Sequence, residues 1–173
     1  MYMAAAPDSP AVRIVPSSEL DLVRLNELVN DPEVSRYLDL IPPVPIEATL
    51  AFWRHVESGL VNLWSIWLDD RIIGCTGMVF NPPGTKLSHA AAFFLYLEPA
   101  SWGRGIGDLV MNHLESNARL RGLIRLECLV ASTNNRAIRL YERHGFVREG
   151  AKRNAFLDGK EFADLLILGK LLG

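Results

Sequence analysis

The segment that most restricts the fold of this chain is residues 97–108, which reads LEPASWGRGIGD. An apolar, strand-like run ends near Pro99, and a glycine-rich turn then leads directly into a helical pattern. Gly103, Gly105 and Gly107 stand at alternate positions, so the backbone N–H groups of the turn can approach a ligand closely. The first N–H groups of the following helix have no partner inside the helix and lie at its positive end. The segment therefore predicts a strand, a turn and a helix that together form an anion site suited to a pyrophosphate.

Two common nucleotide-binding motifs do not fit this turn. The glycine spacing is not G-x-G-x-x-G, and no G-K-[ST] follows, so a dinucleotide fingerprint and a Walker-type site are both disfavoured. Arg104 adds a positive charge within the turn, which favours an anionic ligand. The structural alternative is a helix start that needs small residues only for close packing.

A second informative segment is residues 134–146, which reads NNRAIRLYERHGF. Asn134 is suited to the N-cap of a helix, and Tyr141 follows seven residues later, two turns along the same helix. Taken alone, Asn134 would be only a cap and Tyr141 a half-buried core aromatic. Because Asn134 follows the glycine turn by about 27 residues, a functional interpretation of the two residues is also considered.

The remaining pattern alternates between strands and helices. Apolar residues recur at helical spacing in some segments, and strand-like runs end at Asp-Asp-Arg, Asn-Pro-Pro-Gly and Asp-Gly turns in others. This order predicts an α/β (α+β) domain with a mixed sheet and helices on its faces. We expect strands at 12–15, 61–68, 72–80, 90–97, 124–130, 147–157 and 162–171, helices at 19–29, 45–59, 105–121 and 134–144, and a helical turn at 33–37.

Length and composition set limits on domain number and partners. At 173 residues the chain is expected to form a flexible tail at 1–10 and one domain at 11–173. A net charge of −2 gives no general attraction to nucleic acid, and no run approaches a membrane-spanning helix. We expect a cytoplasmic protein without nucleic-acid or membrane partners. Cys75 and Cys128 lack metal or redox spacing and are expected to be buried, and no residue set has metal-ligand spacing.

With both segments in view, the chain resembles the GNAT acetyltransferases. The match covers the strand, glycine turn and helix, and then the N-x-x-A-I-x-L-Y-E-x-x-G-F pattern. W-G-R-G at 102–105, R-L-E at 125–127 and G-F-V-R-E-G at 145–150 look most like the branch of ribosomal-protein N-terminal and spermidine N-acetyltransferases. The tight resemblance covers residues 93–164, and it implies a mostly antiparallel sheet that splays between its central strands.

The resemblance also implies a cosubstrate, acetyl-CoA, and the residues that contact it. The pyrophosphate would lie on the turn, and the pantetheine arm would pair with backbone at Tyr96 and Leu97 and contact Asn134. Tyr141 would protonate the departing thiolate. The turn residues implied in cofactor binding are Trp102, Gly103, Arg104, Gly105, Ile106, Gly107 and Asp108.

The usual general base of the family is not evident in this chain. Where many members carry a carboxylate on the strand before the turn, this sequence has Ala91 and Ala92. Glu127, His89 or a water molecule are the candidates for the base. An alkyl amine with a pKa of about 10.4 is neutral in fewer than about one molecule in a thousand at pH 7, whereas an α-amine is neutral in roughly a tenth to a sixth. A chain without an evident base therefore suits an α-amine better than a lysine or polyamine.

The expected function is transfer of an acetyl group to a primary amine, either a protein N-terminal α-amine or a small-molecule amine, by direct attack in a ternary complex. The resemblance places the acceptor near Tyr37, Trp53, Trp64 and the loop 156–161, although these aromatics also suit a core. An inactive acyl-CoA-binding module of the same fold and a nucleotide enzyme are the alternatives. An edge strand or hairpin could support a homodimer.

Overall fold

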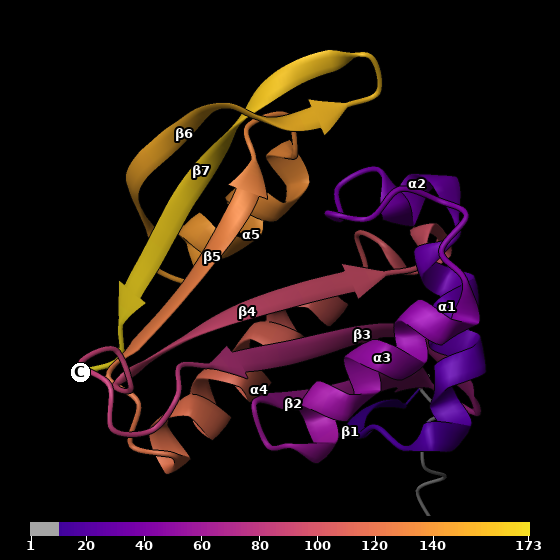
Figure 1. Cartoon of the computed structure of the whole chain (residues 1–173), viewed down its shortest axis with the longest axis horizontal. Helices are drawn as coiled ribbons and strands as arrows, with labels where there is room; N and C mark the ends of the chain where they lie inside the picture. The colour runs from indigo at the N-terminus through magenta and orange to yellow at the C-terminus, as the bar shows by residue number, and fades with distance from the viewer. Residues whose placement is uncertain (1–10) are drawn as a thin grey trace, which may run out of the picture.

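A single seven-stranded sheet organises the molecule, as seen in the computed structural model, which describes residues 11–173 (Figure 1). The expected tail at 1–10 lies outside the described residues. The strand order is β1-β2-β3-β4-β5-β7-β6, and all neighbours are antiparallel except β4 and β5. The strands are β1 (Val12–Pro16), β2 (Val61–Leu68), β3 (Arg71–Phe80), β4 (Ala90–Leu97), β5 (Arg125–Ala131), β6 (Val147–Asp158) and β7 (Glu161–Leu171).

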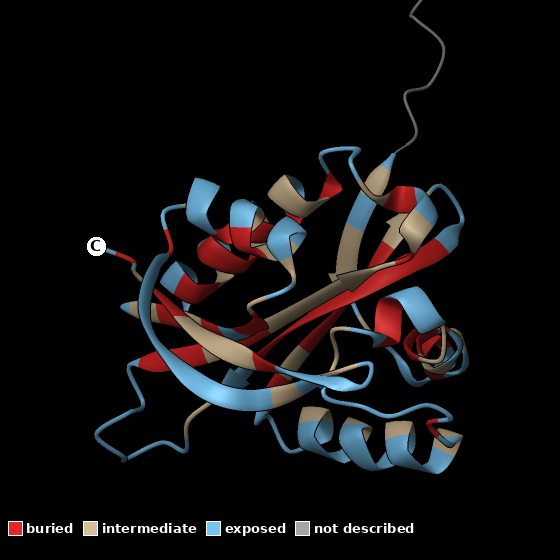
Figure 2. Ribbon diagram, turned by 90° about the horizontal axis from the view of Figure 1, so that it is seen from above, coloured by how far each residue is buried: buried red, intermediate tan, exposed pale blue. Residues whose placement is uncertain are grey.

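Helices cover the sheet unequally. Figure 1 shows α1 and α3 in front of β1–β3, and α4 and α5 behind the sheet. The bounds are α1 (Leu22–Val29), α2 (Pro32–Ser35), α3 (Ile46–Glu57), α4 (Ile106–Leu120) and α5 (Asn135–Arg143), with 3-10 turns η1 (Glu19–Asp21) and η2 (Pro99–Ser101). The front of the β5–β7–β6 part carries no helix, and β6 is exposed along most of its length (Figure 2). The mixed, mostly antiparallel fold predicted from the sequence is confirmed.

Two hydrophobic cores lie on opposite faces of the sheet. The larger one packs α4 and α5 against the back, and one face of α4, formed by Ile106, Val110, Leu114 and Ala118, is buried in it. The smaller one packs α1 and the inner side of α3 against the front. Apolar residues at helical spacing therefore mark the buried faces, as expected.

Local boundaries depart from the expected ones by a few residues. The helix predicted at 19–29 begins as the 3-10 turn η1, with Ser18 at its N-cap, before the α-helix starts at Leu22. The turn predicted at 33–37 is the short helix α2, which starts one residue earlier because Pro32 occupies its first turn and Asp31 caps it.

The central strands separate, and this separation positions the site. β4 and β5 pair only between residues 90–92 and 125–127 and then diverge (Figure 1). Beyond that point the strands form the two walls of a wedge-shaped gap. The predicted splay is therefore present.

Candidate functional site

A cavity of about 320 Å³ lies in the gap between the diverging strands. Its walls come from β4 and β5, from the glycine turn and the start of α4, from α5, and from α2. Most of the site residues predicted from the sequence line it. These are Tyr96, Leu97, Trp102, Gly103, Gly105, Ile106, Gly107, Asp108, Asn134 and Tyr141.

The glycine turn presents a row of free backbone donors to this cavity. Within the described part of the chain, the N–H groups of residues 103–107 donate to no backbone or side-chain acceptor, and α4 has no side-chain cap. Gly103 and Gly105 have φ of +71° and +76°, a conformation that glycine adopts without steric cost. Unpartnered donors at the positive end of a 15-residue helix form a site for a phosphate or pyrophosphate group.

The third glycine of the turn serves packing. A Cβ at Gly107 would lie 2.9 Å from Leu140 Cδ2, so glycine lets the first turn of α4 approach α5 closely. Close packing therefore explains the glycine at position 107, as the structural alternative expects. The positive φ explains the glycines at positions 103 and 105.

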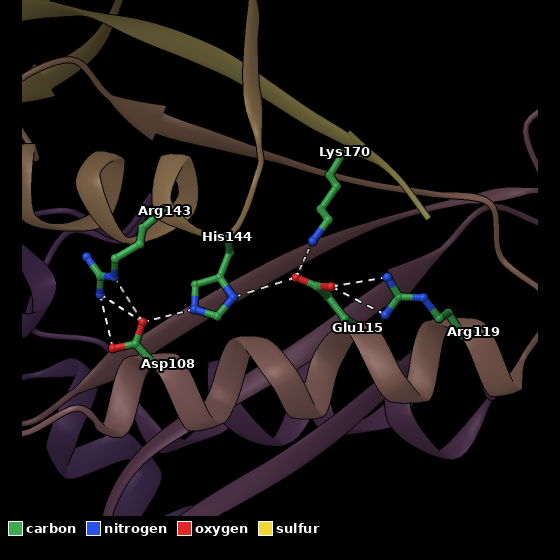
Figure 3. Close-up of polar contacts among 6 residues, drawn as sticks. All are labelled: Asp108, Glu115, Arg119, Arg143, His144 and Lys170. Carbon is green, nitrogen blue, oxygen red and sulfur yellow. Dashed lines mark hydrogen bonds and ion pairs between the residues drawn. The ribbon is translucent and has the colours of Figure 1, made fainter. Parts of the chain in front are cut away.

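A charged network holds α4 against α5 next to the turn (Figure 3). Asp108 of α4 accepts hydrogen bonds from Arg143 at 2.8 Å and from His144 at 2.9 Å. The His144 hydrogen bond and the Arg143 guanidinium hold the Asp108 pKa below its usual range. His144 also faces Glu115, which forms an ion pair of 2.7 Å with Lys170. Asp108 therefore orients the helix that carries the free N–H groups. Its own charge is negative, so it does not itself attract an anionic ligand.

A buried carboxylate fixes the other end of the turn. Glu98 is 7% exposed and accepts hydrogen bonds from Arg24 of α1 at 3.1 Å and from Arg71 of β3 at 2.6 and 2.7 Å. The Ser101 hydroxyl donates to the same carboxylate at 3.2 Å. Local spacing in the sequence does not indicate this cluster, because the partners of Glu98 lie far away in the chain.

The edge of β4 offers backbone groups to the cavity at alternate residues. The Tyr96 carbonyl lies against Gly74 of β3, so the backbone of Tyr96 faces β3, and its side chain packs against the front core. The Leu97 carbonyl accepts a 2.8 Å hydrogen bond from the Trp102 indole on the gap side. Because strand residues alternate, Phe93 and Leu95 also direct their backbone groups into the gap. The backbone groups on the gap side are therefore those of Phe93, Leu95 and Leu97, and the ligand contact expected at Tyr96 and Leu97 stays a prediction.

Two arginines of α5 were missed by the sequence analysis. Arg136 and Arg139 line the cavity, and the Arg136 guanidinium lies 3.6 Å from the centre of the Trp102 ring. Together with Arg143 they recur at helical spacing along one face of α5, a signal that was present in the sequence. Their charges favour an anionic ligand beside the turn.

Tyr141 lies where a proton donor could act. It is 6% exposed, lines the cavity, and packs edge-on against Phe93 at 5.2 Å between ring centres. Burial raises the pKa of its hydroxyl well above the usual range, so this group keeps its proton at neutral pH. Cys128, also in the cavity, has its pKa raised by burial to about 12 and stays a thiol. The expected burial of both cysteines is confirmed.

Asn134 has two roles available to it. Its side chain accepts a hydrogen bond from the Ala137 N–H at 3.2 Å and so caps α5, and the residue also lines the cavity. The amide NH₂ group faces no acceptor in the described residues, which leaves a donor for a ligand.

Three predicted residues do not line the cavity. Glu127 is the last residue of β5 that pairs with β4, and its side chain is held by Arg125 at 2.9 Å. His89 is exposed before the first residue of β4, at the opposite end of that strand from the turn. Arg104 is exposed on the turn, with its side chain outside the cavity lining. The structure therefore brings neither side-chain candidate for the base into the cavity.

Of the three aromatic residues predicted near the acceptor, only Tyr37 lines the cavity. Tyr37 lines the cavity from the front together with Glu33, Val34 and Leu38. Trp64 is buried in the core behind the sheet, edge-on to His113, and Trp53 packs into the front core. Both tryptophans are core residues, because Trp64 points from β2 into the back core and Trp53 points from α3 toward the front of the sheet.

Two further properties concern the described residues alone. No helix within residues 11–173 is long and apolar enough to cross a membrane. In the same range no group of three or more His, Cys, Asp or Glu side chains could hold a metal ion.

The chain belongs to the acetyltransferase (GNAT) family, whose model matches residues 23–146. Among curated proteins it is similar to the [Ribosomal protein bS18]-alanine N-acetyltransferase of Salmonella typhimurium, with 30% identity over 82 residues. That match covers 47% of this chain and 55% of the Salmonella protein, so the chain spans about half the length of this relative.

Solved structures share the fold at lower identity. An N-acetyltransferase from Staphylococcus aureus superposes with a TM-score of 0.85 at 16% identity, covering 94% of this chain and 99% of that one. The spermidine N-acetyltransferase of Vibrio cholerae, solved with CoA and spermine, gives 0.83 at 19% identity, covering 93% and 95%. At identities of 16% and 19% the structural similarity is evidence for the fold alone.

Proposed function

We propose that this protein transfers an acetyl group from acetyl-CoA to a primary amine, either the α-amine of a protein N-terminus or a small-molecule amine. The observation that carries the proposal is the row of free N–H groups at residues 103–107, in the same cavity as the Tyr141 hydroxyl. Family membership and the Vibrio structure with CoA support the same cosubstrate.

The residues present fit coenzyme A. The free N–H groups of the turn suit its pyrophosphate, and Arg136 and Arg139 add positive charge beside them. The gap-facing backbone of β4 at Leu95 and the Asn134 amide suit the amide groups of the pantetheine arm. When bound, acetyl-CoA supplies a thioester carbonyl that a neutral amine can attack.

Direct transfer is the mechanism that the side chains favour. The amine nitrogen bonds to the thioester carbonyl carbon as the carbon–sulfur bond breaks, and Tyr141 gives its proton to the departing sulfur. The proton lost by the amine goes to water, and Tyr141 recovers its own from the same source. Cys128 is a poor nucleophile because its pKa of about 12 leaves almost no thiolate at neutral pH, so an acetyl-cysteine intermediate is disfavoured.

The absence of Glu127 and His89 from the cavity favours an acceptor that needs little help with deprotonation. An α-amine meets this requirement better than a lysine. The same absence is the observation that favours the alternative, an inactive acyl-CoA-binding module. We propose a cytoplasmic location on family grounds, and the homodimer remains a prediction.

A panel of amines, assayed by release of the CoA thiol, tests the proposal. We expect turnover with alanine-first peptides or small α-amines at pH 8. Acetyl-CoA binding without turnover on any amine would support the inactive module instead. Absence of acetyl-CoA binding would overturn both.

A further inference from the structure

The open end of the wedge is bridged on its front side by one cluster of side chains. Arg36, at the end of α2, forms a two-point ion pair with Asp158, at the end of β6, with distances of 2.9 and 3.2 Å. The Thr133 hydroxyl donates to the same carboxylate at 2.7 Å, and the Tyr37 hydroxyl donates to the Thr133 carbonyl at 3.3 Å. We call these four residues the clasp.

The clasp joins the front edges of two parts of the chain that are otherwise held together by the β4–β5 pairing and, behind the sheet, by the packing of α4 against α5. Arg36 and Asp158 are 122 residues apart, and Tyr37 and Thr133 are 96 apart. The β4–β5 pairing that connects the two walls ends at residues 92 and 127. The clasp therefore sets how far α2 and the β6–β7 hairpin stand from each other.

The clasp lies at the rim of the cavity. Tyr37 lines the cavity, and Thr133 directly precedes Asn134, which also lines it. The Asp158 side chain is 9% exposed while that of Arg36 is 57% exposed, so the pair reaches from the rim into solvent. Figure 1 shows α2 and the hairpin on the opposite side from α4 and α5, which carry the anion-binding groups.

The pair is ionised across the neutral range. The Arg36 and Thr133 hydrogen bonds lower the pKa of Asp158 below its usual range. A two-point arginine–carboxylate contact also fixes geometry better than a single contact does.

We propose that the clasp limits the width of the port through which the amine acceptor enters, and so selects slender, extended amines over amines held close to a folded surface. This inference rests on the proposed acetyl transfer. An acceptor carried by a bulky body must displace α2 or the hairpin, whereas a free peptide terminus or a linear amine can pass beside the closed clasp. Arg36 and Asp158 are specificity-determining residues in this account and take no part in bond making.

The test compares two forms of one amine. The probes are an alanine-first tetrapeptide and the same four residues joined without a linker to a folded domain. The quantity measured is the ratio of kcat/KM for the fused form to kcat/KM for the free peptide. We expect Arg36→Gln and Asp158→Asn each to raise this ratio at least fivefold, with the affinity for acetyl-CoA unchanged. Thr133→Val, which removes one bond and keeps the side-chain shape, should raise it less.

Arg148→Gln is the matched control. Arg148 is 55% exposed and forms a 2.8 Å ion pair with Glu142, but neither residue lines the cavity. This variant should leave the ratio unchanged. If the wild type acetylates these amines and both Arg36→Gln and Asp158→Asn keep the wild-type ratio, the role of the clasp is overturned and the proposed function stands. No wild-type turnover on any amine would overturn the proposed function and, with it, the role of the clasp in selection.

Discussion

The back and front walls of the cavity are built in different ways. The back wall consists of the glycine turn, α4 and α5, which are close in sequence and joined by Gly107 against Leu140 and by Asp108 against Arg143. The front wall consists of α2, and the clasp joins it, across more than a hundred residues of chain, to the β6–β7 hairpin, which lies outside the cavity lining. We propose that the back wall binds acetyl-CoA and that the front wall selects the acceptor.

The largest expected effect is on the chemical step at the back wall. We expect Tyr141→Phe to lower kcat about 100-fold or more, because the departing sulfur loses its proton donor. Affinity for acetyl-CoA and thermal stability should change little, since the ring keeps its packing against Phe93. Steady-state kinetics combined with calorimetry measures these quantities, and full turnover by this variant would remove Tyr141 from the mechanism.

The next prediction compares the glycine turn with the hairpin through the same substitution, glycine to alanine, made once in each. Gly105 has φ of +76° at the turn, and Gly159 has φ of +69° at the hairpin tip, each with open space where a Cβ would point. Alanine should destabilise each site by about 1 kcal/mol through the left-handed backbone. Gly105→Ala should also weaken acetyl-CoA binding about tenfold, because relaxing the turn rotates the free N–H groups away.

Gly159→Ala is the matched control for that substitution. It should lower the melting temperature to a similar extent and leave the acetyl-CoA dissociation constant unchanged. Equal losses of affinity in the two variants would contradict the assignment of the anion site to the turn.

The pH dependence of the reaction reports on the acceptor side. With an α-amine acceptor and no side-chain base, kcat/KM should rise roughly six- to tenfold from pH 7 to pH 9, with a midpoint near 7.7–8.0 set by the amine itself. Stopped thiol-release assays at saturating acetyl-CoA measure this profile. A midpoint near 6.5 that is independent of the amine would instead point to a histidine base.

The smallest effect concerns the Asp108 network. The folded-state pKa of Asp108 is lower than the ordinary 3.8, so its ion pairs stabilise the fold above that value and are lost as pH falls through the folded-state pKa. Asp108→Asn should therefore cost up to about 1 kcal/mol at pH 7 and less at pH 3. Urea unfolding at both pH values measures the difference. A loss of stability that is independent of pH would mean that the side chain acts through packing alone.

The contrast between the walls also explains what the sequence could predict. The turn, the cap at Asn134 and the placement of Tyr141 follow local spacing, so they were predicted and lie together. Arg136 and Arg139 also had a local signal in their helical spacing, and that signal was overlooked. The mostly antiparallel sheet and its splay between the central strands followed from the family resemblance.

The remaining features depend on distant pairings that spacing does not encode. The contacts of Glu98 with Arg24 and Arg71, and of Arg36 with Asp158, join segments far apart in the chain. Glu127 was a candidate base because it lies near the splay, but its side chain pairs with Arg125 outside the cavity. Trp64 was placed near the acceptor, but it points into the core behind the sheet. Glu127 lies where β4 and β5 still pair, and Trp64 lies on the face of β2 that packs against the back core.

Thermal unfolding of the purified protein with and without acetyl-CoA tests the central claim most directly, with NAD as the control ligand. The account predicts a clear rise in melting temperature with acetyl-CoA, equivalent to about 2.7 kcal/mol at 100 times the dissociation constant, and no rise with NAD. The rise should be smaller in Gly105→Ala and undiminished in Gly159→Ala at equal ligand concentration. No shift of the wild type by acetyl-CoA would contradict the assignment of the glycine turn as a coenzyme A site.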